Sequence, residues 1–362
     1  MTSPVATTVS TSVSTPVSIR AREPAAATVT TESLQRRLDT RTKPQGSLGT
    51  LETLAIQIGL ALDSETPVFR SPHAFVFAGD HGIAVDGVSA YPQAVTAQMV
   101  LNYLSGGAAI NVLARQYGLA LVVIDAGIAS DTAAHPALSR FGIAHGTKNY
   151  RLEPAMTPEE CKRAIAAATA LASDALAQGS NALLLGEMGI GNTASAAMLL
   201  HSVTGWPLEE CVGRGTGLDD AGLQRKLALL RESAMRCPRP ASAIDALIEF
   251  GGFEIAALVG ALLATVERPC IAVIDGFTVS VAAMLAMEID PRVRSRCVFS
   301  HCSAEAAHRA LLQRLNARPI LDLEMRLGEG SGAALAWPVI DATARLMTSM
   351  ASFESAGVSH RS

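Results

Sequence analysis

Asn181-Ala182-Leu183-Leu184-Leu185-Gly186-Glu187-Met188-Gly189-Ile190-Gly191-Asn192-Thr193 is the stretch of this 362-residue chain that best indicates its fold. A short apolar run ends in a glycine-rich turn, and an alanine-rich segment typical of a helix follows. Strand, turn and helix in this order form a cradle for an anion, because backbone N–H groups and the helix dipole both point at it. The stretch therefore indicates an α/β fold with a phosphate bound at the turn.

Two alternatives exist for the same turn. The spacing Gly189-x-Gly191-x-x-Ala194 also fits the dinucleotide fingerprint, which requires a second strand ending in an acid about 20 residues on. Glu209 and Glu210 lie at that distance, but the residues before them, 204–207, read as a turn and not as a strand. We therefore prefer a single phosphate to NAD. Glycines that only allow a helix to pack closely on a strand are the second alternative.

Four further apolar runs of strand length alternate with helical segments, at residues 73–79, 119–126, 269–275 and 296–301. Each ends in polar residues, namely Asp80-His81, Asp125, Asp275 and Ser300-His301. Ligands of α/β folds bind beyond the carboxyl ends of the strands. The alternation therefore predicts one parallel sheet with a polar crevice along its carboxyl edge.

Composition excludes several classes of protein. Apolar residues make up 49% of the chain and aromatic residues 4%, which suits helices packed on a buried parallel sheet. The net charge of −4 provides no basic surface for nucleic acid, and no apolar run reaches the roughly 20 residues that span a bilayer. The six cysteines form no CxxC pair, which fits buried thiols in a reducing cytoplasm.

A second candidate site lies near the C-terminus, where Glu329 stands between Gly328 and Gly330 ahead of a long apolar helix, residues 333–350. Glycines on both sides let the backbone bend sharply and approach a ligand closely. The helix would place Glu329 near a positive helix N-terminus. We interpret Glu329 as a catalytic base; the alternative is a helix entry whose Glu stabilises the dipole.

Other candidate motifs have simpler interpretations. Asp219 and Asp220 follow a glycine-rich loop and resemble a magnesium–diphosphate site, but no apolar strand precedes them, so a helix N-cap is preferred. Lys226, on the next predicted helix, would by default be solvated. Cys297, His301, Cys302 and His308 are zinc-ligating types, but strand and helix periodicities scatter them over different faces.

The motifs taken together resemble one family, the nicotinate-nucleotide–dimethylbenzimidazole phosphoribosyltransferases, which activate the lower-ligand base of cobalamin. The matching pieces occur in family order and extend from about Leu34 to Met350. They are Thr42-Lys43-Pro44 through Leu48-Gly49, Gly79-Asp80-His81-Gly82, Gly87-Val88-Ser89-Ala90-Tyr91-Pro92, Gly186 to Thr193, Gly213-Arg214-Gly215-Thr216-Gly217, Ile274-Asp275-Gly276-Phe277, Ser300-His301 and Arg326 to Gly332.

The resemblance implies a reaction and the residues that perform it. Nicotinate mononucleotide and 5,6-dimethylbenzimidazole would give α-ribazole 5′-phosphate and nicotinate, with Glu329 as general base and Glu187 as a second carboxylate of the site. Phosphate and ribose would be held by Gly189, Gly191, Asn192, Thr193, Gly215, Thr216, Lys226 and Asp275. The aromatic base would lie against Ser89, Tyr91, Gln98 and Leu327. The pyridinium ring leaves as a neutral molecule, so the chemistry requires no metal or cofactor.

The resemblance also implies an architecture. We expect a homodimer whose large domain (71–319) is a doubly wound, mostly parallel sheet with helices on both faces. A small helical domain would combine residues 32–70 and 320–350 from both chain ends. Residues 1–31 have the composition of a disordered tail, and residues 351–362 read as a loose C-terminal tail.

Two other functions remain open from the sequence alone. One is an NAD-binding oxidoreductase, which rests on the fingerprint at Gly189. The other is a nucleotide sensor that keeps the fold without turnover, although Glu187 and Glu329 are both present. The sequence does not decide which base is used in the cell, or whether Asp80, His81 and His301 contact substrate.

Overall fold

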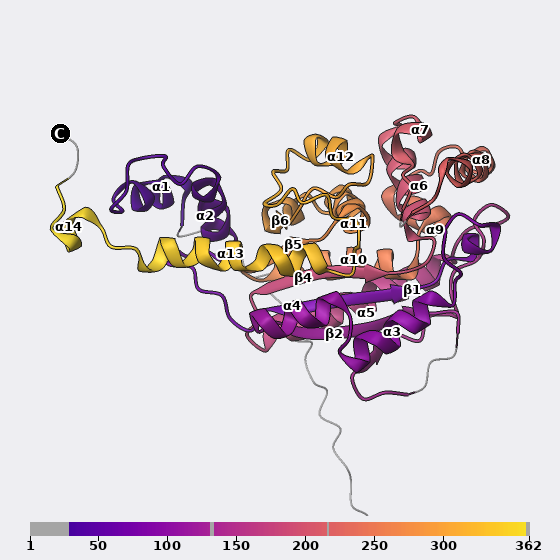
Figure 1. The fold of residues 1–362 in the computed structure, drawn as a ribbon, viewed down its shortest axis with the longest axis horizontal. Helices are drawn as coiled ribbons and strands as arrows, with labels where there is room; N and C mark the ends of the chain where they lie inside the picture. Colours follow the sequence, from indigo (N-terminus) through magenta and orange to yellow (C-terminus); the bar gives the residue numbers. More distant parts are fainter. Residues whose placement is uncertain (1–28, 131–133, 216, 360–362) are drawn as a thin grey trace, which may run out of the picture.

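The apolar runs form one six-stranded sheet in which every neighbouring pair of strands is parallel (Figure 1). The computed structural model describes residues 29–130, 134–215 and 217–359. Along the sheet the strands lie in the order β3-β2-β1-β4-β5-β6. Their bounds are β1 His73–Gly79, β2 Ala120–Gly127, β3 Leu138–Arg140, β4 Ala182–Met188, β5 Ile271–Ile274 and β6 Cys297–Phe299. The predicted parallel sheet is confirmed.

Helices cover both faces of the sheet, which explains why every strand except β3 is a nearly continuous apolar run. In β1, Phe75 and Phe77 belong to one apolar layer, whereas Val76 belongs to the other. The first layer contains α5 (Pro158–Ala177), α6 (Asn192–Thr204), α10 (Phe253–Ala264) and α11 (Phe277–Ile289). The second contains α3 (Val95–Ser105), α4 (Ala109–Tyr117) and α13 (Ser331–Ser349). This is the doubly wound arrangement that the resemblance predicts.

The helix boundaries follow from local sequence signals. Thr157 and Glu160 form a capping box at the start of α5, with Pro158 in its first turn, as predicted. Gly106 ends α3 in the left-handed conformation, so the segment 95–117 is two helices. The other elements are α1 Thr31–Asp39, α2 Thr50–Ala61, α7 Leu208–Cys211, α8 Asp220–Arg236, α9 Ala243–Phe250, α12 His308–Arg314, α14 Phe353–Ala356 and the 3₁₀ segments η1 Gly82–Asp86, η2 Thr265–Glu267 and η3 Pro291–Arg296.

The first and the last described helices meet at one end of the molecule, where α13 runs away from the sheet toward α1, α2 and α14 (Figure 1). Leu34, Leu38 and Met347 share a small apolar cluster there. Backbone hydrogen bonds join residues 40–42 to residues 351–353. Whether this helical end is a separate domain stays a prediction. Most of the predicted N-terminal tail lies outside the described residues, and the predicted C-terminal tail contains the short helix α14.

One strand was missed, because its sequence is not an apolar run. β3 has three residues and lies at the edge of the sheet, in the polar segment between β2 and α5. Its residues Leu138, Ser139 and Arg140 give no apolar run. Over the described part of the chain, no helix combines the length and the hydropathy needed to span a bilayer.

Candidate active site

The candidate site lies where the strand order reverses direction. The chain proceeds outward from β1 to β2 and β3, then returns to β4 on the other side of β1 and continues to β5 and β6. A crevice opens at such a switch point, beyond the carboxyl ends of the central strands. Glu187 is near the end of β4, Asp275 follows β5, and His301 follows β6. The predicted polar edge of the sheet is therefore a cluster in space.

A cavity at this edge is lined by several of the predicted residues. Among them are Ser89, Glu187, Gly189, Gly191, Asn192, Thr193, Gly215 and Leu327. Gly191 is the N-cap of α6 at φ +100°, and no side chain caps this helix, so its first turn faces the cavity. Gly189 also packs against the Gly79 carbonyl oxygen, where a Cβ would approach to 2.3 Å. The turn thus combines a helix N-terminus fit for an anion with the close packing that was its alternative.

Lys226 is buried beneath this cavity, and the prediction of a solvated side chain is wrong. Its Nζ donates hydrogen bonds to Thr193 Oγ1 at 3.0 Å and to the Gly213 carbonyl oxygen at 3.1 Å. Burial lowers the pKa of Lys226 to about 8, and the charge of Glu305 opposes that shift. The cation therefore lies directly under two segments that line the cavity.

Glu329 is held in a turn of three left-handed residues, with φ of +77° at Gly328, +65° at Glu329 and +76° at Gly330. Its backbone N–H donates to the Glu187 carbonyl oxygen at 3.2 Å. Gly328 lines the cavity, and Glu329 lies just behind it, 6% exposed. Residues other than glycine rarely adopt this backbone conformation. Backbone strain of this kind is concentrated at functional sites.

Burial and neighbouring charges make this pair of carboxyl groups unusual acids. Burial raises the pKa of Glu329 to about 7; the nearby Tyr103 hydroxyl lowers it, and the negative charge of Asp275 raises it. Burial, with the charges of Glu254, Asp275 and Glu329, raises the pKa of Glu187 well above its ordinary range, although Asn192 donates to its carboxyl group. An acid that titrates near pH 7 is well suited to general base catalysis.

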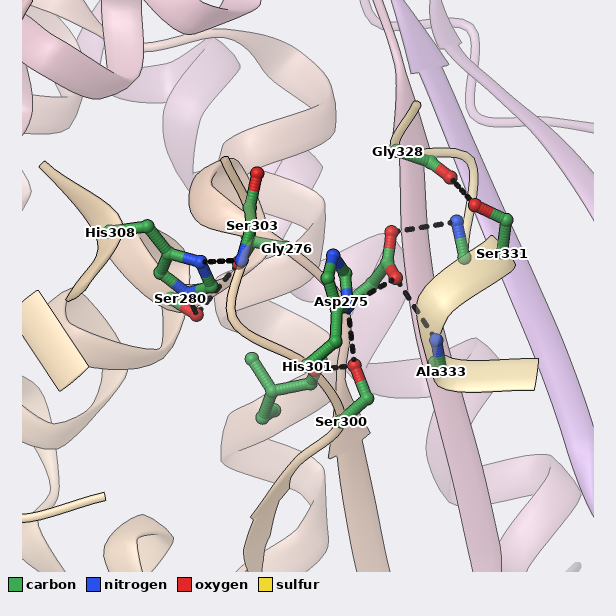
Figure 2. Close-up of polar contacts among 12 residues, drawn as sticks. Asp275, Gly276, Ser280, Ser300, His301, Ser303, His308, Gly328, Ser331 and Ala333 are labelled. Carbon is green, nitrogen blue, oxygen red and sulfur yellow. Dashed lines mark hydrogen bonds and ion pairs between the residues drawn. The ribbon is translucent and has the colours of Figure 1, made fainter. Parts of the chain in front are cut away.

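Besides buried Lys226, three further predicted contacts do not line the cavity. Tyr91 and Gln98 are exposed and are not part of its lining, although Tyr91 is next to lining residue Ala90. Asp275 is fully buried behind the lining, where it accepts backbone hydrogen bonds from the start of α13 (Figure 2). The predicted contact at Thr216 lies outside the described residues.

The structure brings other groups to the site that the sequence did not single out. Arg214 and Arg326 line the cavity, and both lie inside motifs that carried the family resemblance. Tyr103 is buried in α3 and faces Glu329; burial and the charges of Glu329 and Glu187 raise the pKa of its phenol. In sequence it is an apolar position of an amphipathic helix, so no local signal marks it. His301 also lines the cavity.

Asp80 and His81 lie deeper than the cavity and form a buried support for the glycine turn. His81 is fully buried, with Nε2 2.6 Å from Glu254 Oε1 and Nδ1 2.8 Å from Ser195 Oγ. Neither Asp80 nor His81 is part of the cavity lining. A Cβ on Gly191 would approach the His81 side chain to 3.2 Å, so the histidine packs directly behind the turn.

The NAD alternative requires a second strand ending in an acid about 20 residues after the glycine turn, and the structure has no strand there among the described residues. Glu209 and Glu210 lie in α7, and Glu209 pairs with Arg231 on the surface. In the described chain the next strand after β4 is β5, about 80 residues further on and separated from it by five helices. The magnesium–diphosphate alternative is also replaced, because Asp219 is the N-cap of α8, accepting from Gly222 N at 2.7 Å.

Comparison with known proteins agrees with this geometry. A family model described as phosphoribosyltransferase matches residues 24–358. A protein of Dechloromonas aromatica named nicotinate-nucleotide–dimethylbenzimidazole phosphoribosyltransferase is 53% identical over 332 residues, covering 91% of this chain and 95% of the relative. One of the same name from Cupriavidus necator is 50% identical over 326 residues, 90% and 94% of the two chains.

A solved structure shows the same fold at similar coverage. The crystal structure of CobT from Thermus thermophilus superimposes with a TM-score of 0.88 at 41% sequence identity. The match covers 91% of this chain and 99% of the other. The likeness therefore extends over most of both chains.

Proposed function

The chain belongs to the family of nicotinate-nucleotide–dimethylbenzimidazole phosphoribosyltransferases, pentosyltransferases of cobalamin biosynthesis, and from that premise we propose how its site works. The enzyme transfers the phosphoribosyl group of nicotinate mononucleotide to 5,6-dimethylbenzimidazole. The products are α-ribazole 5′-phosphate and nicotinate. Glu329 is the general base, and the anomeric carbon is inverted.

The nucleotide phosphate binds at the start of α6. Gly189, Gly191, Asn192 and Thr193 surround this position, and Lys226 supplies a cation from below. Gly215 and Arg214 close the cavity from the loop before α8. A helix N-terminus, backbone N–H groups and a buried ammonium group together favour a dianion.

The benzimidazole lies at the other end of the cavity, against Ser89 and Leu327, whereas Tyr91 and Gln98 lie outside the lining. Leu327 directly precedes the Gly328–Gly330 turn, so a ring there lies next to Glu329. A flat apolar contact of this kind recognises shape more than hydrogen-bonding pattern. Related benzimidazoles and purines are therefore expected as weaker substrates.

The chemical step moves one electron pair and one proton. The unprotonated benzimidazole nitrogen attacks the anomeric carbon from the face opposite the pyridinium ring. The bond from that carbon to the pyridine nitrogen breaks, and its electron pair stays on the nitrogen, so nicotinate leaves with a neutral ring. Glu329 accepts the proton of the other benzimidazole nitrogen. Opposite-face attack converts the β-nucleotide into an α-nucleotide, and alignment of the two rings supplies much of the rate enhancement.

The observation that carries this proposal is the state of Glu329. It is a buried carboxyl group with a pKa of about 7. It is fixed beside the cavity by a left-handed turn, a backbone conformation that glutamate disfavours. A base of that pKa is largely ionised just above neutral pH, and it still binds a proton strongly enough to assist the attack.

The test is nicotinate release from nicotinate mononucleotide with 5,6-dimethylbenzimidazole. We expect Glu329→Gln to lower kcat by about 10²-fold or more while nucleotide binding is retained. Glu324→Gln is the matched control, because Glu324 also has a left-handed backbone but is exposed. If Glu329→Gln turns over at the wild-type rate, the proposed reaction stands but Glu329 is not its general base. Nucleotide binding without turnover of any benzimidazole would indicate a sensor.

Two further parts of the proposal concern the whole protein. We place the enzyme in the cytoplasm, with the homodimer of its family as the active form. Light scattering at micromolar concentration measures the mass directly, and a monomer that is fully active at the same concentration would contradict the dimer.

A further inference from the structure

Asp275, which was predicted as a phosphate or ribose contact, binds the start of a helix in this structure. It follows β5 and is fully buried, and its two oxygens accept from two backbone N–H groups at the start of α13 (Figure 2). Oδ2 accepts from Gly330 N and Oδ1 from Ala333 N, each at 3.0 Å. The first N–H groups of a helix have no partner within the helix, so this carboxylate caps α13 from another element.

The cap fixes the backbone on one side of Glu329. Gly330, whose N–H binds Asp275, directly follows Glu329, and the Glu329 N–H is bound by the Glu187 carbonyl oxygen at 3.2 Å. The turn between these two points is left-handed at all three residues. A conformation that a glutamate disfavours persists only when the surrounding structure imposes it.

Resting on the proposed function, we propose that Asp275 is a positioning residue of the reaction, which holds the Glu329 carboxyl group at the cavity through the start of α13. His301, in the segment that follows β6, supports it, with Nδ1 3.6 Å from Asp275 Oδ1 and 3.1 Å from Ser300 Oγ. The Ser300 hydroxyl in turn donates to the Ile274 carbonyl oxygen at 2.7 Å. The chain of contacts thus links the ends of β5 and β6 to the base.

Asp275 also affects the charge state of Glu329. A free helix N-terminus would lower the pKa of a nearby carboxyl group. Here Asp275 binds those N–H groups, and its own charge raises the pKa of Glu329. The other groups that face Glu329 are Tyr103 from α3 and Glu187 from β4, and Asp275 itself faces His301 from β6.

The test is Asp275→Asn, assayed for nicotinate release between pH 5.5 and 9. The amide keeps the shape but removes the charge and one of the two acceptors. We expect kcat to fall at least tenfold, with KM for the nucleotide changed less than threefold, and the acid limb of the kcat profile to move to lower pH. Asp290→Asn is the control, because Asp290 caps η3 on the surface by accepting from Arg292 N.

Other outcomes would overturn the inference. A folded Asp275→Asn enzyme with wild-type kcat would do so, and so would a loss of activity that leaves the pH profile unmoved, because that is the signature of a purely structural role. If this variant does not fold, the role of Asp275 is tested with Ala333→Pro instead. It removes the N–H that binds Oδ1, at a first-turn position where proline is tolerated, and an unchanged kcat would contradict the proposal. Absence of wild-type turnover would instead refute the proposed function, and this inference with it.

Discussion

Tyr103 is a single residue that sets when the proposed base is active. Its buried hydroxyl has no hydrogen-bond partner by distance and angle among the described residues, yet it faces Glu329 closely enough to lower the pKa of that carboxyl group. A hydrogen bond donated by a phenol hydroxyl favours the ionised form of a carboxyl group. Removing the hydroxyl should therefore raise the pKa of Glu329 further above 7.

We expect Tyr103→Phe to move the acid limb of the kcat profile to higher pH by roughly half a unit to one unit. Turnover at pH 6.5 would fall about three- to tenfold, while turnover at pH 9 would stay within about twofold. Tyr117→Phe is the control, since Tyr117 is a half-buried tyrosine at the end of α4 outside the cavity lining. A limb that moves to lower pH, the direction expected for Asp275→Asn, would contradict this role.

Lys226 should take up a proton when the nucleotide binds. Burial lowers its pKa to about 8, so at pH 8 half of the free enzyme carries a neutral amine. A bound phosphate stabilises the ammonium form and raises the pKa again. Calorimetry at pH 8 in buffers of different ionisation enthalpy should show uptake of up to about half a proton. Lys226→Gln should abolish the uptake, and exposed Lys162→Gln should not; uptake that persists in Lys226→Gln would exclude this lysine.

At the scale of elements, β4 supports the turn that carries Glu329. A Cβ on Gly186 would come within 2.3 Å of Gly330 N and 2.7 Å of the Glu329 carbonyl carbon. The Glu329 turn therefore lies directly on the backbone of β4, and only glycine leaves room for it. The glycine in the middle of an apolar strand has this close approach as its physical reason.

Gly186→Ala should displace the turn and lower kcat at least tenfold, because misplacement of a catalytic group by about 1 Å can cost 10²-fold. The phosphate site at Gly189–Thr193 stays in place, so the nucleotide should still bind. Gly205→Ala is the control: it introduces a side chain at φ +72° with no atom within 4 Å, which costs about 1 kcal/mol of stability and leaves kcat unchanged. Equal kcat in both variants would contradict the role of β4.

Elements whose signals are local were predictable from the sequence. The five predicted strands are apolar runs followed by polar residues, and the start of α5 is marked by Thr157, Pro158 and Glu160. Lys226 was expected in solvent, because a position on a helix says nothing about burial, but its side chain is buried. The position of Asp275 depends on α13, 55 residues later, so no local pattern could assign its role.

The residues of the candidate site that lie within recognisable sequence motifs were predictable. The glycine turn and Glu329 stand in glycine contexts that only a ligand or a close approach explains, and the ordered motifs identify the family. Tyr103 reaches the site from the buried face of α3, where a tyrosine is normally interpreted as a residue of the hydrophobic core. His81 is next to a strand end like the others, but it faces inward to Glu254. Sequence shows which residues are near a strand end, whereas packing decides which of them reach the cavity.

At the scale of the whole molecule, α13 connects the candidate site to the paired chain ends. Its first turn is capped by Asp275, and its last carbonyl groups are bound by Arg41, which donates to Met347 O at 2.7 Å and also to Met350 O. The last carbonyl groups of a helix lack partners within the helix, and Arg37 Nε also donates to Met347 O, at 3.0 Å. Arg41 is buried, so its two hydrogen bonds are shielded from water.

Arg41→Ala should lower the free energy of unfolding by roughly 2–4 kcal/mol, because two charge-assisted hydrogen bonds and a buried side chain are lost. Arg345→Ala, which removes an exposed ion pair with Asp341 on the same helix, should cost less than about 0.5 kcal/mol. Urea unfolding measures both. Turnover per folded molecule should stay within twofold in each, since Asp275 fixes the catalytic end of α13 independently. A large fall in kcat for Arg41→Ala without a loss of stability would mean that the two ends of this helix are coupled.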